Sequence, residues 1–475
     1  MSTNISRRKV VAGAAWAAPV VAASAAVPAF ASSTECAYAS APKFNISGQP
    51  SGAKDTVKFT IPAKVDKIRF EVAGGAGGGS NQVAGGSGAL VTGEIPVKEG
   101  QVIELVAAAG GVAYLESVKG VDSKSLWQTR PATGGKGYGN GGDVNEQSIP
   151  ADAKAMVDAN WSGPSDMKRP LYGASGGGSS ALVVNGTPVA VAGGGGGAGI
   201  RTQPGTNNMP DSSPYYNPKA VNTGTTDLDD PAVKSVLPAG ASASAATGDS
   251  AETSVSHYTV LKPHTTPGTA MKVAGGNGGG NGQGGAGGEQ PLLYNKANVF
   301  GVLGFTSQNK QELFSSATAG DKGGSGFDGK GADGVFAYSY QVDNNDISKL
   351  ERVPQTNPPA EGHDVDYDKD YTLKSFNGYQ TVVSAGGGAG YGGGGSGAAR
   401  ALSSIITSQK WNANPLPTRY RQNVGALVQA GAGGAGGSYV APGVADGAIA
   451  SANNAAKVAG VRNPGYVKVY LCERS

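Results

Sequence analysis

Histidine and cysteine are scarce in this sequence, which has three histidines and two cysteines among 475 residues. His257, His264 and His363 lie in polar stretches and have no partner at a metal-ligand spacing, so we interpret them as surface residues. A zinc site of the Cys and His type is therefore not expected. We predict no cofactor and no catalytic residue.

An excess of charge of one sign is also lacking. The chain has 38 Lys plus Arg against 35 Asp plus Glu, and three of the basic residues lie in the first 31 residues. Residues 32–475 therefore carry 35 charges of each sign and no net charge. Because a nucleic-acid-binding domain needs a clustered excess of positive charge, we predict no nucleic-acid partner.

The first 31 residues have the pattern of an export signal. Arg7 and Arg8 precede the uncharged stretch 10–27, and Ala29 and Ala31 frame a small-residue cleavage site. The string SRRKVV resembles the twin-arginine signal, with Val10 where that signal usually has phenylalanine. We predict a signal peptide at 1–31 and a secreted or cell-surface location in a bacterium.

A retained membrane anchor is the alternative interpretation of this stretch, because it approaches the length that spans a bilayer. It is rich in alanine and is interrupted by Pro19. We therefore expect membrane contact only transiently, through the signal peptide.

The two cysteines lie near the ends of the predicted mature chain, at Cys36 and Cys472. An even number of cysteines in an exported protein is typical of a disulfide. We predict this pairing, and the alternatives are free thiols or pairing between chains.

Glycine is abundant, at 79 residues, and is concentrated in runs. The runs lack the strict third-residue repeat of collagen. Between them lie short stretches with the alternation of strands, such as 57–61, 68–72 and 467–471. In SSALVVNGTPVAVA, Asn185-Gly186 between two apolar runs predicts a β-hairpin.

Long polar inserts separate the glycine runs, and we expect them to be surface loops, disordered in part. They span about 112–170, 200–270, 290–320, 336–378 and 399–424. Aromatic residues on such loops can stack on sugars or anchor a protein partner, or they can fold back onto the scaffold. The candidates for binding are Trp161, Tyr215, Tyr216, Tyr367, Tyr371, Trp411 and Tyr420.

Four blocks in order carry a resemblance to a known family. They are IRFEVAGGAGGGS, GASGGGSSALVVNGTPVAVAGGGGGAG, VVSAGGGAGYGGGGSGAA and GAGGAGGSYV. The pattern resembles the glycine-rich domain in the extracellular part of anaplastic lymphoma kinase and leukocyte tyrosine kinase, and of bacterial secreted glycine-rich proteins. The long inserts depart from that family, and they are more similar to the recognition loops of some phage tail-tip adhesins.

The resemblance implies a mostly β fold, in which a β-sandwich is joined to a bundle of glycine helices of the polyproline-II type. Such helices have three residues per turn and no internal hydrogen bonds. Their backbone groups must therefore bond neighbouring helices, which only side-chain-free segments approach closely enough. We expect one glycine-rich domain over 32–475.

Two local patterns suggest a hydrolase active site and a calcium site. GASGG at 173–177 matches the G-x-S-x-G motif of hydrolases around Ser175, although a match is expected by chance in so glycine-rich a chain. Carboxylates at alternate positions are a weak calcium candidate, and a solvated acidic loop is the simpler interpretation. These residues are Asp364, Asp366, Asp368 and Asp370.

Together these observations predict a secreted, non-catalytic glycine-rich scaffold that displays loops for adhesion or partner binding at the bacterial cell surface. The partner is an unknown surface protein or glycan, and a homo-oligomer is an open alternative. The second hypothesis is a self-assembling structural envelope protein, and the third is a secreted hydrolase using Ser175.

Overall fold

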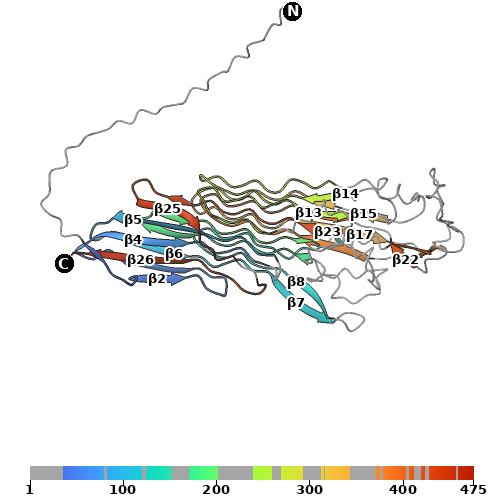
Figure 1. The fold of residues 1–475 in the computed structure, drawn as a ribbon, viewed down its shortest axis with the longest axis horizontal. Coiled ribbons are helices and arrows are strands. Elements are labelled where there is room, and N and C mark those ends of the chain that lie inside the picture. Colours follow the sequence, from blue (N-terminus) through green and yellow to red (C-terminus); the bar gives the residue numbers. More distant parts are fainter. Residues whose placement is uncertain are drawn as a thin grey trace, which may run out of the picture.

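The structure, a computed structural model, describes most of the chain between Cys36 and Arg474. The described residues are 36–79, 83–119, 125–148, 150–151, 171–201, 239–258, 269–292, 312–314, 316–342, 371–374, 378–402, 406–410, 419–422, 427–455 and 458–474. The elements bounded within these ranges are all strands, arranged in several sheets (Figure 1). The prediction that the chain is mostly β is therefore confirmed.

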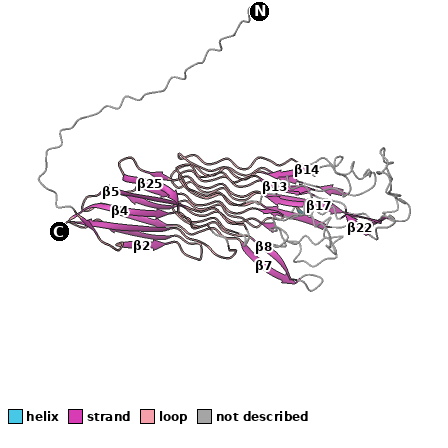
Figure 2. Cartoon of the chain, in the orientation of Figure 1, coloured by secondary structure: helices cyan, strands magenta, loops and turns pink. Residues whose placement is uncertain are grey.

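Two sheets enclose the main hydrophobic core at one end of the molecule (Figure 2). The six-stranded sheet has the order β1-β26-β4-β5-β25, with β2 also paired to β26. Its strands are β1 (Ala37–Tyr38), β2 (Phe44–Ser47), β4 (Val65–Ala73), β5 (Ala89–Pro96), β25 (Ala445–Ser451) and β26 (Tyr466–Glu473). The five-stranded sheet has the order β24-β11-β10-β6-β3. Its strands are β3 (Asp55–Thr60), β6 (Val102–Ala107), β10 (Ser180–Val184), β11 (Thr187–Ala192) and β24 (Tyr439–Val440).

Period-two alternation explains why these segments form facing sheets. Every second residue of β4 and β26 is buried between the two sheets, and the residues between them face outward. The buried pairs are Val467 with Val72, Val469 with Phe70 and Leu471 with Ile68. Burying each such side chain contributes about 1.5–3 kcal/mol to folding.

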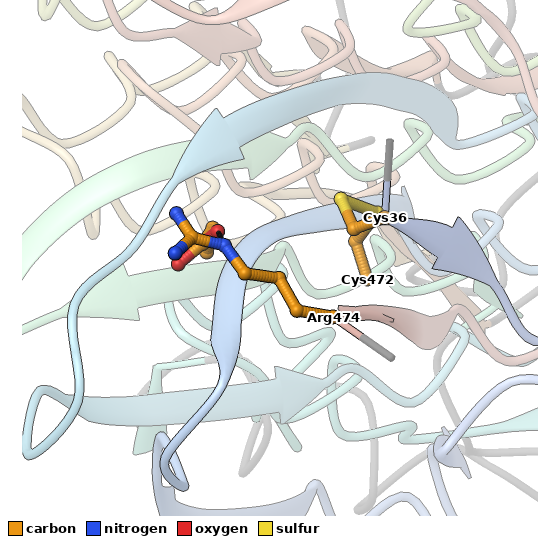
Figure 3. Close-up of a disulfide and its surroundings, with 4 residues drawn as sticks. Cys36, Cys472 and Arg474 are labelled. Carbon is orange, nitrogen blue, oxygen red and sulfur yellow. Dashed lines mark ion pairs between the residues drawn. A yellow bond between two sulfur atoms is a disulfide. The ribbon is translucent and has the colours of Figure 1, made fainter. Parts of the chain in front are cut away.

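The last strand, β26, lies inside the six-stranded sheet and not at its edge. It pairs antiparallel with β4 on one side and with β1 and β2 on the other. Cys472 of β26 forms the predicted disulfide with Cys36, and their Cα atoms are 5.2 Å apart (Figure 3). Beside it, Arg474 forms an ion pair with Asp66.

The predicted hairpin is present as β10 and β11. Asn185 and Gly186 have φ values of 47° and 80°, which the tight turn between the strands requires. The Asn185 side-chain oxygen also accepts a hydrogen bond from the Val102 backbone N–H at 2.9 Å, which ties the turn to β6.

Glycine-rich segments run side by side between the two ends of the molecule (Figure 2). They bond to one another through the backbone. In residues 194–198, successive N–H groups donate to different neighbouring segments. Residues 194 and 197 donate to one segment, and residues 195 and 198 donate to another. The donor and acceptor pairs are Gly194 with Ala389, Gly195 with Gly75, Gly196 with Ala241, Gly197 with Gly386 and Ala198 with Gly78. The same spacing recurs where residues 385, 388 and 391 donate to residues 431, 434 and 437.

The distances between these segments leave no room for side chains. A Cβ atom on Gly77 would overlap the carbonyl oxygen of Gly196, and one on Gly196 would overlap that of Gly433. Glycine is required here for close approach of backbones and not for a special φ angle.

Smaller sheets lie at the other end of the glycine segments (Figure 1). Two of them have four strands, in the orders β12-β23-β20-β16 and β15-β17-β19-β9. The bounds are β9 (Leu171–Tyr172), β12 (Ile200–Arg201), β15 (Glu312–Phe314), β16 (Ser316–Thr318), β17 (Phe336–Val342), β19 (Gly378–Val383), β20 (Ala399–Leu402) and β23 (Leu427–Ala430). The others are the pairs β7 (Tyr114–Lys119) with β8 (Ser125–Arg130) and β13 (Ser254–Tyr258) with β14 (Thr269–Val273), and the sheet β18 (Tyr371–Lys374), β21 (Ile406–Lys410) and β22 (Arg419–Gln422).

The expectation that the inserts are loops needs correction. Strands occupy part of every insert, for example β17 in the insert 336–378 and β20 in the insert 399–424. Alternation in segments such as Phe336–Val342 favours strands, although polar residues dominate the inserts as a whole.

Candidate functional site

The inserts leave the glycine segments at one end of the molecule. The strands within them lie on the side away from the six-stranded sheet, as the positions of β7, β13, β15, β17 and β22 show (Figure 1). Backbone hydrogen bonds tie each glycine segment to several others. The strands of the inserts therefore begin and end on a rigid base. This insert-bearing end is opposite the end that carries the disulfide.

Two candidate aromatic residues, far apart in sequence, meet in one sheet. Tyr371 of β18 pairs with Gln409 of β21, and Gln409 pairs with Tyr420 of β22. The three residues therefore form one row across this sheet. The remaining aromatic candidates, Trp161, Tyr215, Tyr216, Tyr367 and Trp411, lie outside the described residues.

Other predicted residues also lie outside the described ranges. These are the signal residues Arg7, Arg8, Ala29 and Ala31, the calcium candidates Asp364, Asp366, Asp368 and Asp370, and two histidines, His264 and His363. His257 is in β13, opposite Ala270 of β14.

Within the described ranges, no three His, Cys, Asp or Glu side chains are grouped so that they could hold a metal ion. No helix of the described chain is long and apolar enough to cross a bilayer.

Ser175 is fully buried among the glycine segments, and its hydroxyl group bonds only to backbone groups. It accepts a hydrogen bond from the Val112 N–H at 2.9 Å and lies within donating distance of the Thr133 carbonyl oxygen at 2.9 Å and the Val112 carbonyl oxygen at 3.1 Å. A hydroxyl in this position joins three segments of backbone, and no solvent reaches it.

A cluster of aromatic residues, which sequence reasoning missed, lies where the glycine segments meet the five-stranded sheet. The aromatic cluster consists of Tyr138, Phe327, Tyr391 and Tyr439, all half-buried. The Phe327 ring stacks on Tyr391 with centroids 4.6 Å apart and meets the edge of Tyr439 at 4.9 Å. Tyr138, Phe327 and Tyr439 cover Ala181, Val183 and Val191 on the outer face of β10 and β11.

The sequence does contain a signal for this cluster. Tyr138, Phe327 and Tyr391 are each the single aromatic residue within a glycine run, and each sits in a bend or turn. Burial, with the charge of Asp328 beside it, raises the pKa of Tyr138. The cluster joins the glycine segments to the sheet, and the contacts between its rings leave each of them only partly exposed.

A second group of aromatic and charged residues covers the outer face of the six-stranded sheet. The Arg69 guanidinium lies 4.7 Å from the ring centroids of both Tyr38 and Tyr470. Burial, with the negative charge of the neighbouring Glu94, raises the pKa of Tyr38 to about 12. The Glu71 carboxylate accepts hydrogen bonds from Lys468 at 3.1 Å and from the Tyr470 hydroxyl at 3.3 Å.

No protein-family model matches the chain, and no curated protein sequence is significantly similar to it.

Proposed function

We propose that the chain is an exported, non-catalytic glycine-rich scaffold that displays its inserts for adhesion or partner binding at the surface of a bacterial cell. The observation that carries the proposal is the position of the inserts, whose strands lie at one end of a backbone-bonded glycine array. The signal-like segment before Cys36 and the neutral composition of residues 32–475 support it. The partner is a surface protein or a glycan.

In this proposal the two facing sheets form a β-sandwich, and the glycine segments are polyproline-II-type helices packed into a bundle. Hydrogen bonds that return to the same neighbour every third residue support that assignment, because such helices have three residues per turn. The lack of room for a Cβ atom supports it too. Both features agree with the resemblance to the glycine-rich domain family.

Rigidity suits this function. A loop on a fixed base loses less conformational freedom when it binds than a loop on a mobile one. The buried, backbone-bonded hydroxyl of Ser175 supports a structural role for that residue, and with it the non-catalytic proposal.

The test is to shorten the inserts without disturbing their base. Gln341 pairs with Gly378, and Leu402 pairs with Leu427, so residues 342–377 and 403–426 can each be replaced by an Asn-Gly turn. We expect the shortened protein to unfold at nearly the same urea concentration as the parent and to lose binding to bacterial cells and wall fragments. The parent protein is the matched control.

Undiminished cell binding by the shortened protein would contradict the proposal. If both proteins instead form oligomers whose size grows with concentration in sedimentation velocity, the self-assembling envelope protein becomes the better explanation.

A further inference from the structure

Two strands of substantial length lie at the ends of the strand orders of the two facing sheets. The six-stranded sheet ends at β25 and the five-stranded sheet at β3, whereas β1 and β24, at the other ends, have two residues each. A strand at an edge has a row of unpaired backbone N–H and C=O groups, with which another chain can pair. β25 and β3 are therefore the candidates for pairing with a further strand.

The outer edge of β25 is open at Ile449 and Ser451. The Ala452 N–H donates to the Gly88 carbonyl oxygen, in line with the register of β25 on β5. Because bonded residues alternate along a strand, Ala450 bonds to β5, whereas Ile449 and Ser451 turn their backbone groups outward. No described segment bonds to those outward groups. The Ile449 side chain packs against the main core and is only partly buried, so a strand added beside β25 buries it further.

The edge of β3 is protected against a second copy of the chain. The Ile61 N–H donates to the Gln101 carbonyl oxygen next to β6, so by alternation Lys58 turns its backbone groups outward. Antiparallel pairing of two copies about Lys58 would place this lysine opposite itself, and pairing about Thr56 would place it opposite Lys54. Like charges directly opposite each other are destabilising, and lysine on an edge strand is a common protection against association.

The edge of β25 carries no such protection. Antiparallel pairing of two copies about Ile449 opposes uncharged residues. The opposed pairs are Ile449 with itself, Ala448 with Ala450 and Gly447 with Ser451. The small side chains at 448 and 450 leave room for a neighbouring strand on the outer face. The edge is thus complementary to itself.

The single charge of β25 lies outside these pairs. Asp446 is at a bulge, where the register shifts between Ala445 and Ala448, and its φ is 51°. When two copies pair about Ile449, Asp446 falls opposite Ala452. The pairing therefore brings no like charges together.

We infer that β25 pairs antiparallel with β25 of a second copy of this chain, so that the two six-stranded sheets become one continuous sheet. Both copies use the same edge, so the contact is isologous and closes at a dimer. The strands of this sheet run along the length of the molecule, with the insert-bearing end beyond them (Figure 1). Antiparallel pairing therefore points the two insert-bearing ends in opposite directions.

A dimer of this shape can bridge two surfaces. β25 lies toward the end of the molecule that carries the disulfide, so the copies overlap along the facing sheets and their glycine segments extend away from each other (Figure 1). The bridging role rests on the proposed function, whereas the dimer itself does not. Two insert-bearing ends on one particle hold two cells together more firmly than either end binds alone.

The experiment measures association of the full oxidised protein. Sedimentation velocity over a series of concentrations should show a monomer that becomes a dimer and nothing larger. Small-angle X-ray scattering should give the dimer a greater maximum dimension than the monomer, because the two copies point in opposite directions. Bacterial cells mixed with the dimer should clump.

Two matched variants of β25 test the register of the pairing. Ala448→Lys combined with Ala450→Lys opposes two lysines in each pair and should weaken the dimer about tenfold or more. Ala448→Lys combined with Ala450→Glu opposes each lysine to a glutamate and should dimerise at least as well as the parent. Both positions are exposed, so neither variant alters the core.

A variant of the other edge is the control for added charge. Thr56→Lys combined with Thr60→Lys changes exposed residues of β3 and should dimerise like the parent. Circular dichroism checks that all variants fold. The variant with two lysines in β25 should still bind cells and should no longer clump them.

A parent protein that stays monomeric at every concentration would overturn the inference. So would equal dimerisation of the two β25 variants, loss of the dimer in the β3 variant, or growth beyond two copies. Cell binding separates this inference from the proposed function. A dimer that binds no cells contradicts the function and leaves the pairing intact, whereas a monomer that binds cells through its inserts contradicts the pairing alone.

Discussion

Cys36 and Cys472 are joined although 436 positions separate them, and their Cα atoms are 5.2 Å apart. The bond lies beside the pairing of β1 with β26, in which Tyr38 is opposite Cys472. It closes the two facing sheets, the glycine segments and the inserts into a single covalent loop. The disulfide lies at the end of the molecule opposite the inserts, so it does not constrain their conformation.

Replacing both cysteines by serine should lower the free energy of unfolding by about 2–4 kcal/mol, because the open chain has more conformational freedom when unfolded. The measurement is urea unfolding followed by circular dichroism. Since the core between the two sheets does not include the disulfide sulfur atoms, we expect the variant still to fold.

Reductant provides the control for this prediction. It should lower the unfolding midpoint of the parent to that of the double-serine variant and leave the variant unchanged. A parent protein that is as stable with reductant as without it would contradict the prediction.

The glycine segments should not tolerate a methyl group. Gly196→Ala places a Cβ atom against the carbonyl oxygen of Gly433, which is itself fixed by hydrogen bonds to neighbouring segments. We expect the variant to lose about 3 kcal/mol of stability or to fail to fold, because the backbones must separate. Thermal unfolding and limited proteolysis measure the effect.

Gly100→Ala is the matched control. Gly100 has a φ of 85° but open space around its Cβ position, so alanine should cost only about 1–2 kcal/mol of backbone strain. If Gly196→Ala were no more harmful than Gly100→Ala, the close packing of the segments would be in doubt.

Stability should fall at high pH because of Tyr38. Burial, with the negative charge of the neighbouring Glu94, raises its pKa to about 12, above the ordinary value of 10.0, so folding favours the protonated phenol. The stabilising contribution is complete below pH 10 and is lost as the pH rises from about 10 to 12. Urea midpoints measured across this interval should decline.

Tyr38→Phe tests the assignment of that decline. The ring remains available to the Arg69 guanidinium, and the ionisable hydroxyl is gone. The urea midpoint of the variant should therefore decline less between pH 10 and 12 than that of the parent. A decline of the same size in both proteins would show that other groups cause it.

Local signals in the sequence identified several elements correctly. Alternation located β4 and β26, and Asn185-Gly186 located the hairpin, because period-two burial and positive φ leave their mark on neighbouring residues. The disulfide followed from cysteine count and predicted export. These features depend on residue type more than on distant contacts.

Non-local relationships escaped the sequence analysis. Nothing in the sequence shows that Gly194 bonds Ala389, because glycine has no side chain to encode a partner. Tyr371 and Tyr420 meet only through their pairing with Gln409 of β21. The aromatic cluster was missed because Tyr138, Phe327 and Tyr391 lie in runs whose composition resembles a linker.

The aromatic cluster should contribute to stability more than its partial exposure suggests. Phe327→Ala removes the ring that contacts both Tyr391 and Tyr439 and uncovers the outer face of β10 and β11. We expect a loss of about 3 kcal/mol in urea unfolding. Phe327→Leu, which keeps an apolar cover, should lose less, and equal stability of all three proteins would contradict a structural role.

Ser175 distinguishes a structural hydroxyl from a nucleophile. Ser175→Ala leaves the buried Val112 N–H without its 2.9 Å partner, so the free energy of unfolding should fall by about 1–3 kcal/mol. Ser51→Ala, at an exposed turn, is the control and should change stability by no more than about 0.5 kcal/mol. Urea unfolding and an ester-hydrolysis assay are run on both variants and on the parent. Loss of an esterase activity at unchanged stability is the result that would restore the hydrolase hypothesis, because a nucleophile, unlike a buried structural hydroxyl, can be removed without weakening the fold.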